Sequence, residues 1–133
     1  MSESKQQLIA EKERVFDESG ALIATVWEKY PNEERLPGES WLEMRERTKS
    51  LRDAAAQEAI SRARKFSAAP DLIKALKKIV DSAEQHAFEY WLASESPSGC
   101  VEQVQDQWEK SSEYEQFCCD WETELAALAK AGA

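Results

Sequence analysis

The sequence contains very little histidine and cysteine, and this scarcity excludes most catalytic and metal-binding chemistry. Among 133 residues there is one histidine, His86, and there are three cysteines, Cys100, Cys118 and Cys119. A di-iron helical bundle needs two Glu-x-x-His pairs, and Ser-His-Asp or Cys-His catalysis would depend on His86 alone. An odd number of cysteines, two of them adjacent, argues against a disulfide framework and for a reducing compartment. We expect no catalytic residue, no metal site, no cofactor and no enzyme activity.

Long apolar runs and clustered glycines are also missing. No stretch approaches the ~20 apolar residues of a membrane span, and residues 1–7 lack the basic-then-apolar layout of a signal peptide. The four glycines are too far apart to form a phosphate-binding loop. We therefore expect a cytoplasmic protein with no membrane partner and no nucleotide chemistry.

Positive charge is in deficit. The chain has 17 Lys and Arg against 26 Asp and Glu, a net charge of −9. Direct nucleic-acid binding is disfavoured, because proteins that bind DNA or RNA use Lys and Arg to displace phosphate counterions. The expected partners are proteins.

Glycine and proline are few and lie at a few junctions, so the stretches between them are free to be helical. These stretches are rich in Ala, Glu, Lys, Gln, Arg and Leu, which favour helix over strand. We predict no strand. The sequence predicts an all-α fold in which residues 1–133 form one domain, a compact bundle of four to five helices at about 4–30, 40–66, 70–94, 100–111 and 113–129.

Apolar residues recur at helical spacing in each predicted segment. In the first segment the stripe runs from Leu8 through Leu22, Ile23 and Trp27 to Tyr30, and Pro31 closes it. The other helices are predicted to turn these residues inward: Trp41, Met44, Thr48, Leu51, Ala55, Ala59 and Phe66; Leu72, Ile73, Leu76, Ile79, Val80, Ala83, Ala87, Phe88, Tyr90 and Trp91; Val101, Val104 and Trp108; Phe117, Trp121, Leu125 and Leu128.

Capping patterns mark several helix starts. Ser40 and Glu43 match a capping box, as do Ser112 and Glu115, so the last helix is expected to begin near Ser112. Pro70 suits the first turn of a helix, where its missing N–H costs nothing, and we expect a new helix to begin there.

Acidic residues concentrate in the carboxyl-terminal quarter. Residues 99–133 carry eight acids and two lysines. One interpretation is a solvated face that complements the basic second helix, where Arg45, Arg47, Arg52, Arg62, Arg64 and Lys65 are expected to form internal salt bridges. The other is phosphate mimicry, in which carboxylates at helical spacing present negative charge to a basic protein. The candidate partner-binding residues are Glu102, Asp106, Glu109, Glu113 and Glu115.

Aromatic residues are numerous. Five Trp, three Tyr and four Phe are many for a small bundle to bury. A shared aromatic surface is therefore expected, either in a homodimer or with another protein.

Two stretches resemble segments of small accessory proteins encoded by bacteriophages and prophages. One is the helix start Ala68-Ala69-Pro70-Asp71-Leu72-Ile73-Lys74-Ala75-Leu76; the other begins at Phe88-Glu89-Tyr90-Trp91 and leads through Pro97-Ser98-Gly99 to Val104-Gln105-Asp106-Gln107-Trp108. The resemblance covers about a third of the chain and implies no catalytic residue. It implies a context, because such proteins often bind and block host complexes, including CRISPR effectors, nucleases and polymerase-associated factors.

Three functions remain open on these grounds. The first is a non-enzymatic, acidic helical binding protein that inhibits or modulates a host nucleic-acid-handling or defence complex, as an anti-CRISPR protein or DNA mimic does. The second is a structural homodimer whose aromatic face is its whole function. The third is a small metal-binding protein or enzyme that uses His86, Glu89 and Cys118.

Overall fold

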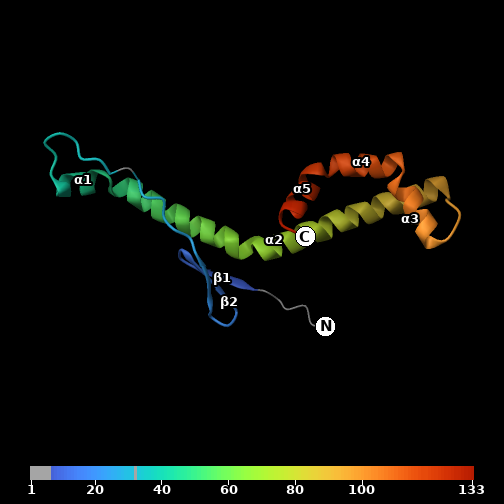
Figure 1. Cartoon of the computed structure of the whole chain (residues 1–133), viewed down its shortest axis with the longest axis horizontal. Coiled ribbons are helices and arrows are strands. Elements are labelled where there is room, and N and C mark those ends of the chain that lie inside the picture. Colours follow the sequence, from blue (N-terminus) through green and yellow to red (C-terminus); the bar gives the residue numbers. More distant parts are fainter. Residues whose placement is uncertain (1–6, 32) are drawn as a thin grey trace. The chain divides into compact units, whose positions relative to one another are not determined.

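The computed structural model describes residues 7–31 and 33–133 of the chain. Helices account for 64% of the structure, and a small antiparallel sheet precedes them (Figure 1). The chain divides into two compact units, residues 1–70 and 71–133, here called unit 1 and unit 2. The elements are β1 (Leu8–Glu11), β2 (Arg14–Asp17), β3 (Leu22–Thr25), α1 (Trp41–Arg47), α2 (Lys49–Glu95), α3 (Val101–Glu109), α4 (Ser112–Asp120) and α5 (Glu122–Lys130).

The prediction of an all-α fold is wrong at the amino terminus. The helix predicted over residues 4–30 is replaced by the sheet β1-β2-β3, in which Ile9 pairs with Phe16 and Val15 with Ala24. Residues 4–6 of that prediction lie outside the described residues. The expectation of one domain over residues 1–133 stays a prediction.

Local turn chemistry explains why the sheet forms. The Asp17 carboxylate accepts hydrogen bonds from the N–H of Ser19 (2.9 Å) and of Ala21 (3.0 Å), and from the Ser19 hydroxyl (2.6 Å). Gly20 has a φ of +84°, a conformation that suits glycine. The bond from Ser19, followed by that from Ala21, lowers the pKa of Asp17. This Asp-x-Ser-Gly turn separates β2 from β3 and stops a helix from running through.

In unit 1 the capping box at Ser40 is confirmed. The Ser40 hydroxyl accepts from the Glu43 N–H (3.2 Å), and the Glu43 carboxylate accepts from the Ser40 N–H (2.7 Å). The predicted helix over 40–66 is interrupted, because α1 ends at Arg47 and α2 begins at Lys49. At the break, the buried Thr48 hydroxyl donates to the Met44 carbonyl (2.8 Å).

Helix α2 continues through Pro70, so the separate helices predicted over 40–66 and 70–94 are wrong. A proline inside a helix removes one backbone hydrogen bond and crowds the preceding turn. The flanking sequence Ser67-Ala68-Ala69 before it and Leu72 to Leu76 after it favours helix strongly enough to carry the segment on.

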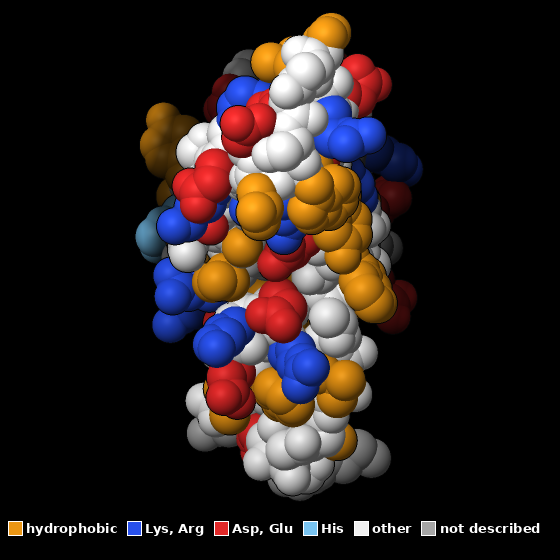
Figure 2. Space-filling view, turned by 90° about the vertical axis from the view of Figure 1, so that its left-hand side faces the viewer, with side chains coloured by type: hydrophobic (Ala, Val, Ile, Leu, Met, Phe, Trp, Pro, Cys, Tyr) orange, Lys and Arg blue, Asp and Glu red, His pale blue; other side chains and the backbone are white. Residues whose placement is uncertain are grey.

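Unit 1 buries few side chains and exposes many. Val15, Met44, Thr48, Ala59 and Ala63 are buried, whereas Trp41, Leu51 and Phe66, predicted to face inward, are exposed. Figure 2 looks onto the α1 end and shows hydrophobic side chains among charged ones. The large hydrophobic residues of unit 1 that are about half exposed or more are Ile9, Leu22, Ile23, Trp27, Tyr30, Leu36, Trp41, Leu42, Leu51 and Phe66.

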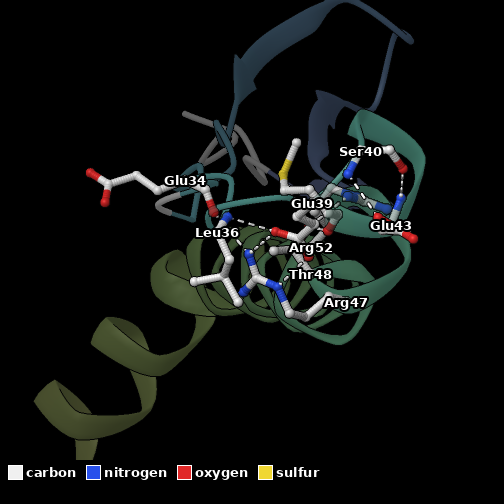
Figure 3. A network of polar contacts seen from close by, with 9 residues as sticks. Glu34, Leu36, Glu39, Ser40, Glu43, Arg47, Thr48 and Arg52 are labelled. Atoms are coloured by element: carbon white, nitrogen blue, oxygen red, sulfur yellow. Dashed lines mark hydrogen bonds and ion pairs between the residues drawn. The ribbon is translucent and has the colours of Figure 1, made fainter.

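Ion pairs tie the segment before α1 to the helices of unit 1 (Figure 3). Arg47 Nε contacts a Glu39 carboxylate oxygen at 2.8 Å, and its Nη2 donates to the Glu34 carbonyl at 2.8 Å. Glu33 is contacted by both Arg45 and Arg52 at 3.2 Å. Together with an Arg62–Glu58 pair at 2.6 Å, these contacts confirm internal salt bridges for four of the six basic residues of the predicted second helix.

Unit 2 is a helical hairpin in which α3 lies at the carboxyl-terminal end of α2 and α4 and α5 run back along this part of α2 (Figure 1). Its core contains the predicted inward residues Val80, Phe117 and Leu128. Around them pack Ile73, Leu76, Ala83, Tyr114, Cys118, Trp121 and Leu125.

Two helices at the end of unit 2 replace the one predicted over 113–129. The chain breaks at Trp121, between α4 and α5. The cap of α4 is Ser111, one residue earlier than predicted, and its hydroxyl accepts from the Tyr114 N–H (3.1 Å). The helix predicted over 100–111 is confirmed as α3, whereas Leu72, Ile79, Tyr90 and Val101 are exposed rather than inward. Among the described residues, no helix combines the length and apolar character needed to cross a bilayer.

Replacing Pro70 tests how much this proline destabilises α2. Pro70→Ala is expected to raise the free energy of unfolding by about 1–3 kcal/mol, because alanine restores an N–H donor and relieves the ring clash. Urea unfolding followed by circular dichroism measures this. Ser61→Ala, at an exposed position of the same helix, is the control and is expected to change it by about 0.5 kcal/mol. Equal stability of the two variants would contradict the prediction.

The Glu39–Arg47 pair predicts an acid-dependent loss of stability. The hydrogen bond from Arg47, followed by that from the Leu36 N–H, lowers the pKa of Glu39. A lowered carboxyl pKa stabilises the fold above the unfolded value of about 4.3, and this stabilisation is lost as pH falls through the folded value. Thermal melting from pH 7 to pH 3 measures this. At pH 7 the melting temperature of Glu39→Gln is expected to be lower than that of wild type, and it is expected to fall less as the pH is lowered. Glu46→Gln removes an exposed carboxylate of α1 and is the control: its melting temperature is expected to change with pH as that of wild type does. If the melting temperature of Glu39→Gln also falls in parallel with wild type, the Glu39–Arg47 pair is not the cause of the acid-dependent loss.

Candidate functional site

Three predicted binding residues share one face of α3. Glu102, Asp106 and Glu109 are spaced by four and three residues, which places them within about 60° of one another around the helix. All three are exposed. The buried Trp108 lies on the opposite side of α3. These three residues are called the acidic face below.

Neighbouring side chains hold parts of the acidic face in place. Lys110 Nζ contacts an Asp106 carboxylate oxygen at 2.8 Å, and the Gln105 amide donates to Glu109 at 3.1 Å. Beside them, Glu102 and Asp106 line a shallow hollow together with Gln103 and Gln107. The acidic face therefore contains three carboxylates, of which Asp106 is paired with a lysine and Glu109 accepts a hydrogen bond from an amide.

The two predicted residues of α4 do not both extend the acidic face. Glu113 and Glu115 are exposed, but helical residues two positions apart in the sequence differ by about 200° around the axis. These two side chains therefore point to opposite sides of α4. Both lie in the first turn of α4, as Glu102 does in α3. A carboxylate in a first turn stabilises a helix by about 0.3–1 kcal/mol through the helix dipole. These residues therefore also have a local structural role.

Two acids of α2 lie beside α3, and the sequence analysis did not single them out. Asp81 and Glu84 line a hollow between α2 and α3 with Gln85, Phe88, Gln105 and Trp108. The pKa of the Tyr114 phenol is raised first by its hydrogen bond to Cys118, then by the electrostatic effect of Cys118 and by burial, and further by the carboxylates of Glu84 and Glu109.

An aromatic row positions α3 against α2. Trp108 of α3 is 1% exposed, and its ring lies 5.5 Å from that of Phe88 and 5.6 Å from that of Trp91, both on α2. The row continues to Tyr114 at 5.4 Å and from there to Phe117 at 6.4 Å. Edge-on and tilted ring pairs of this kind stabilise by about 0.5–1.5 kcal/mol beyond the area they bury. The orientation of the acidic face depends on this packing.

The residues of the metal or enzyme hypothesis are not assembled into a site. His86 is exposed on α2, and Glu89 accepts a hydrogen bond from the Gln85 amide (3.0 Å). Cys118 packs against the core of unit 2. Within residues 7–31 and 33–133, no group of three or more His, Cys, Asp or Glu side chains is placed to hold a metal ion.

Comparison with known proteins gave no relative: no family model, no curated protein and no solved structure matches the chain.

Removing the Trp108 ring tests whether the aromatic row holds α3 against α2. Trp108→Ala is expected to lower the free energy of unfolding of unit 2 by about 3–5 kcal/mol, the usual cost of truncating a buried Trp. Trp27→Ala is the control, because Trp27 is 80% exposed, and it should change stability by no more than about 0.5 kcal/mol. Urea unfolding followed by circular dichroism measures both. Similar losses for the two variants would show that Trp108 does not anchor α3.

Proposed function

We propose that the protein is a non-enzymatic binding module that inhibits or modulates a protein complex by covering a basic, nucleic-acid-binding surface. The observation that carries the proposal is the distribution of charge. Unit 2 has 13 acidic and 5 basic side chains, and so contributes −8 of the net charge of −9. Negative charge focused on one unit attracts a basic surface and repels nucleic acid.

The acidic face is the proposed contact. Glu102, Asp106 and Glu109 extend over two turns of one helix and point away from the buried side of unit 2. Asp81 and Glu84 add carboxylates from a second helix. A row of carboxylates on a rigid helix offers a basic protein regularly spaced negative charges, as a phosphate backbone does. The packing of Trp108 supplies the rigidity.

The target proposed is a host complex with a basic groove, such as a CRISPR effector, a nuclease or a polymerase-associated factor. This part of the proposal rests on the resemblance of residues 68–76 and 88–108 to segments of phage and prophage accessory proteins. In that context the protein acts in the host cytoplasm as an anti-CRISPR-like inhibitor or DNA mimic. It needs no cofactor and makes no direct contact with nucleic acid or membrane.

A second candidate is a homodimer with a structural or assembly role. The observation that favours it is the exposure of large hydrophobic side chains in unit 1, where Trp27 and Tyr30 are 80% and 83% exposed. Trp and Tyr are enriched at interfaces with other proteins. Reversing charges on the acidic face separates the two candidates, because it abolishes inhibition and spares a structural interface.

The test is an affinity pull-down from bacterial lysate at low and at high salt, with bound proteins identified by mass spectrometry. The triple variant Glu102→Lys, Asp106→Lys and Glu109→Lys is expected to lose the partner while keeping its helical circular dichroism, because six units of charge change on one face. The control is a second triple variant that makes the same charge change at exposed positions of unit 1: Glu11→Lys, Glu46→Lys and Asp53→Lys. This variant is expected to retain the partner.

The proposal requires that the captured protein bind nucleic acid and that the wild-type protein inhibit that binding. Capture that survives reversal of the acidic face contradicts it, as does a partner with no nucleic-acid-binding surface. A chain that captures nothing at low salt and forms a clean dimer favours the structural candidate.

A further inference from the structure

Strand β3 leaves one edge of the sheet open. The strand order is β1-β2-β3, so β3 pairs with β2 on one side, and no described strand pairs with it on the other. Its Leu22 and Ile23 side chains are 56% and 50% exposed. An open edge presents backbone N–H and C=O groups that can pair with another strand.

The sequence of β3 lacks the charges and prolines that commonly protect an edge. From Gly20 to Trp27 there are eight consecutive residues without a charge or a proline. Lysines, inward-pointing charges, prolines and bulges are the common protections of edge strands. The register shift between Val15 and Phe16 leaves Ile23 as an extra, unpaired residue of β3, so this strand carries one bulge and neither a charge nor a proline. Strand β1, the other edge, ends in Glu11 and is followed by Lys12 and Glu13.

We propose that β3 pairs antiparallel with β3 of a second copy of this chain, joining two three-stranded sheets into one of six strands. This inference goes beyond the proposed function and does not depend on it. Pairing completes the backbone hydrogen bonds of both edges and buries Leu22 and Ile23 of each copy.

Charge favours a second copy at this position. Unit 1 has 12 basic and 13 acidic side chains, a net charge of −1, whereas unit 2 carries −8. Two copies therefore repel each other least where unit 1 meets unit 1.

Salt distinguishes this contact from the proposed complex with a basic partner. Added salt screens the repulsion between two chains of −9 and strengthens the apolar pairing, so the dimer is expected to tighten. Binding through the acidic face weakens under the same change. A dimer also carries two acidic faces, which raises avidity for a target with two basic sites.

The test is the mass of the purified full chain by light scattering and sedimentation over a range of concentrations and salt. Wild type is expected to form a dimer that dissociates on dilution. Ile23→Lys is expected to weaken it at least tenfold, because the charge sits on the pairing edge. Ile9→Lys makes the same change at a residue of similar exposure, 55%, on β1, and is expected to leave the dimer intact.

Hydrogen exchange of the wild-type chain tests the same contact without a variant. Amides of residues 22–27 are expected to exchange more slowly at high than at low protein concentration, while those of residues 8–11 do not change. The proposal is overturned by a monomer at all concentrations, by a dimer that Ile9→Lys weakens as much as Ile23→Lys does, or by exchange in residues 22–27 that ignores concentration. None of these outcomes bears on capture by the acidic face.

Discussion

The packing of Trp108 against α2 is the interaction on which unit 2 depends. Helices α3, α4 and α5 have nine residues each, too few to be stable alone in water. The rings of Phe88, Trp91 and Trp108 fix α3 to α2, and Tyr114 and Phe117 extend the same contact to α4. First-turn carboxylates and the Ser111 cap add smaller contributions at the helix starts. Short helices therefore acquire a fixed orientation from one aromatic row.

That orientation determines what the charges can do. Because Trp108 lies on the buried side of α3, Glu102, Asp106 and Glu109 must face outward together. The same packing places Asp81 and Glu84 of α2 in one hollow with Gln105 and Trp108 of α3, so acids from α2 lie beside the helix that carries the acidic face. Unit 1 differs in kind: its 12 basic and 13 acidic side chains nearly cancel, some of them form local ion pairs, and many of its large hydrophobic residues are exposed. The two units thus present different surfaces, one acidic and one with exposed hydrophobic residues.

The sequence predicted the buried core of unit 2, missed the continuity of α2 through Pro70 and the break at Trp121, and predicted the wrong elements at the start of unit 1. Apolar spacing found Val80, Trp108, Phe117 and Leu128, because a helix with one buried stripe repeats every three to four residues. It failed between Leu8 and Thr25, where hydrophobic residues at mixed spacing also fit short strands; the Asp17-Glu18-Ser19-Gly20 turn was the available signal. The turn at Lys12, with a φ of +53°, carries no such signal. Helical spacing in the sequence singled out five acids of residues 102–115, three of which share one face of α3, but only the packing of α2 with α3 shows that Asp81 and Glu84 lie beside Gln105 and Trp108.

The central claim is that the carboxylates of unit 2 take the place of nucleic-acid phosphates on a basic protein. The most direct measurement is the affinity for the captured partner as a function of salt, repeated with excess duplex DNA as competitor. The account predicts that the logarithm of the association constant falls steeply and linearly with the logarithm of salt concentration, and that DNA displaces the protein. An affinity that is indifferent to salt, or a complex that binds protein and DNA at once without competition, would contradict it.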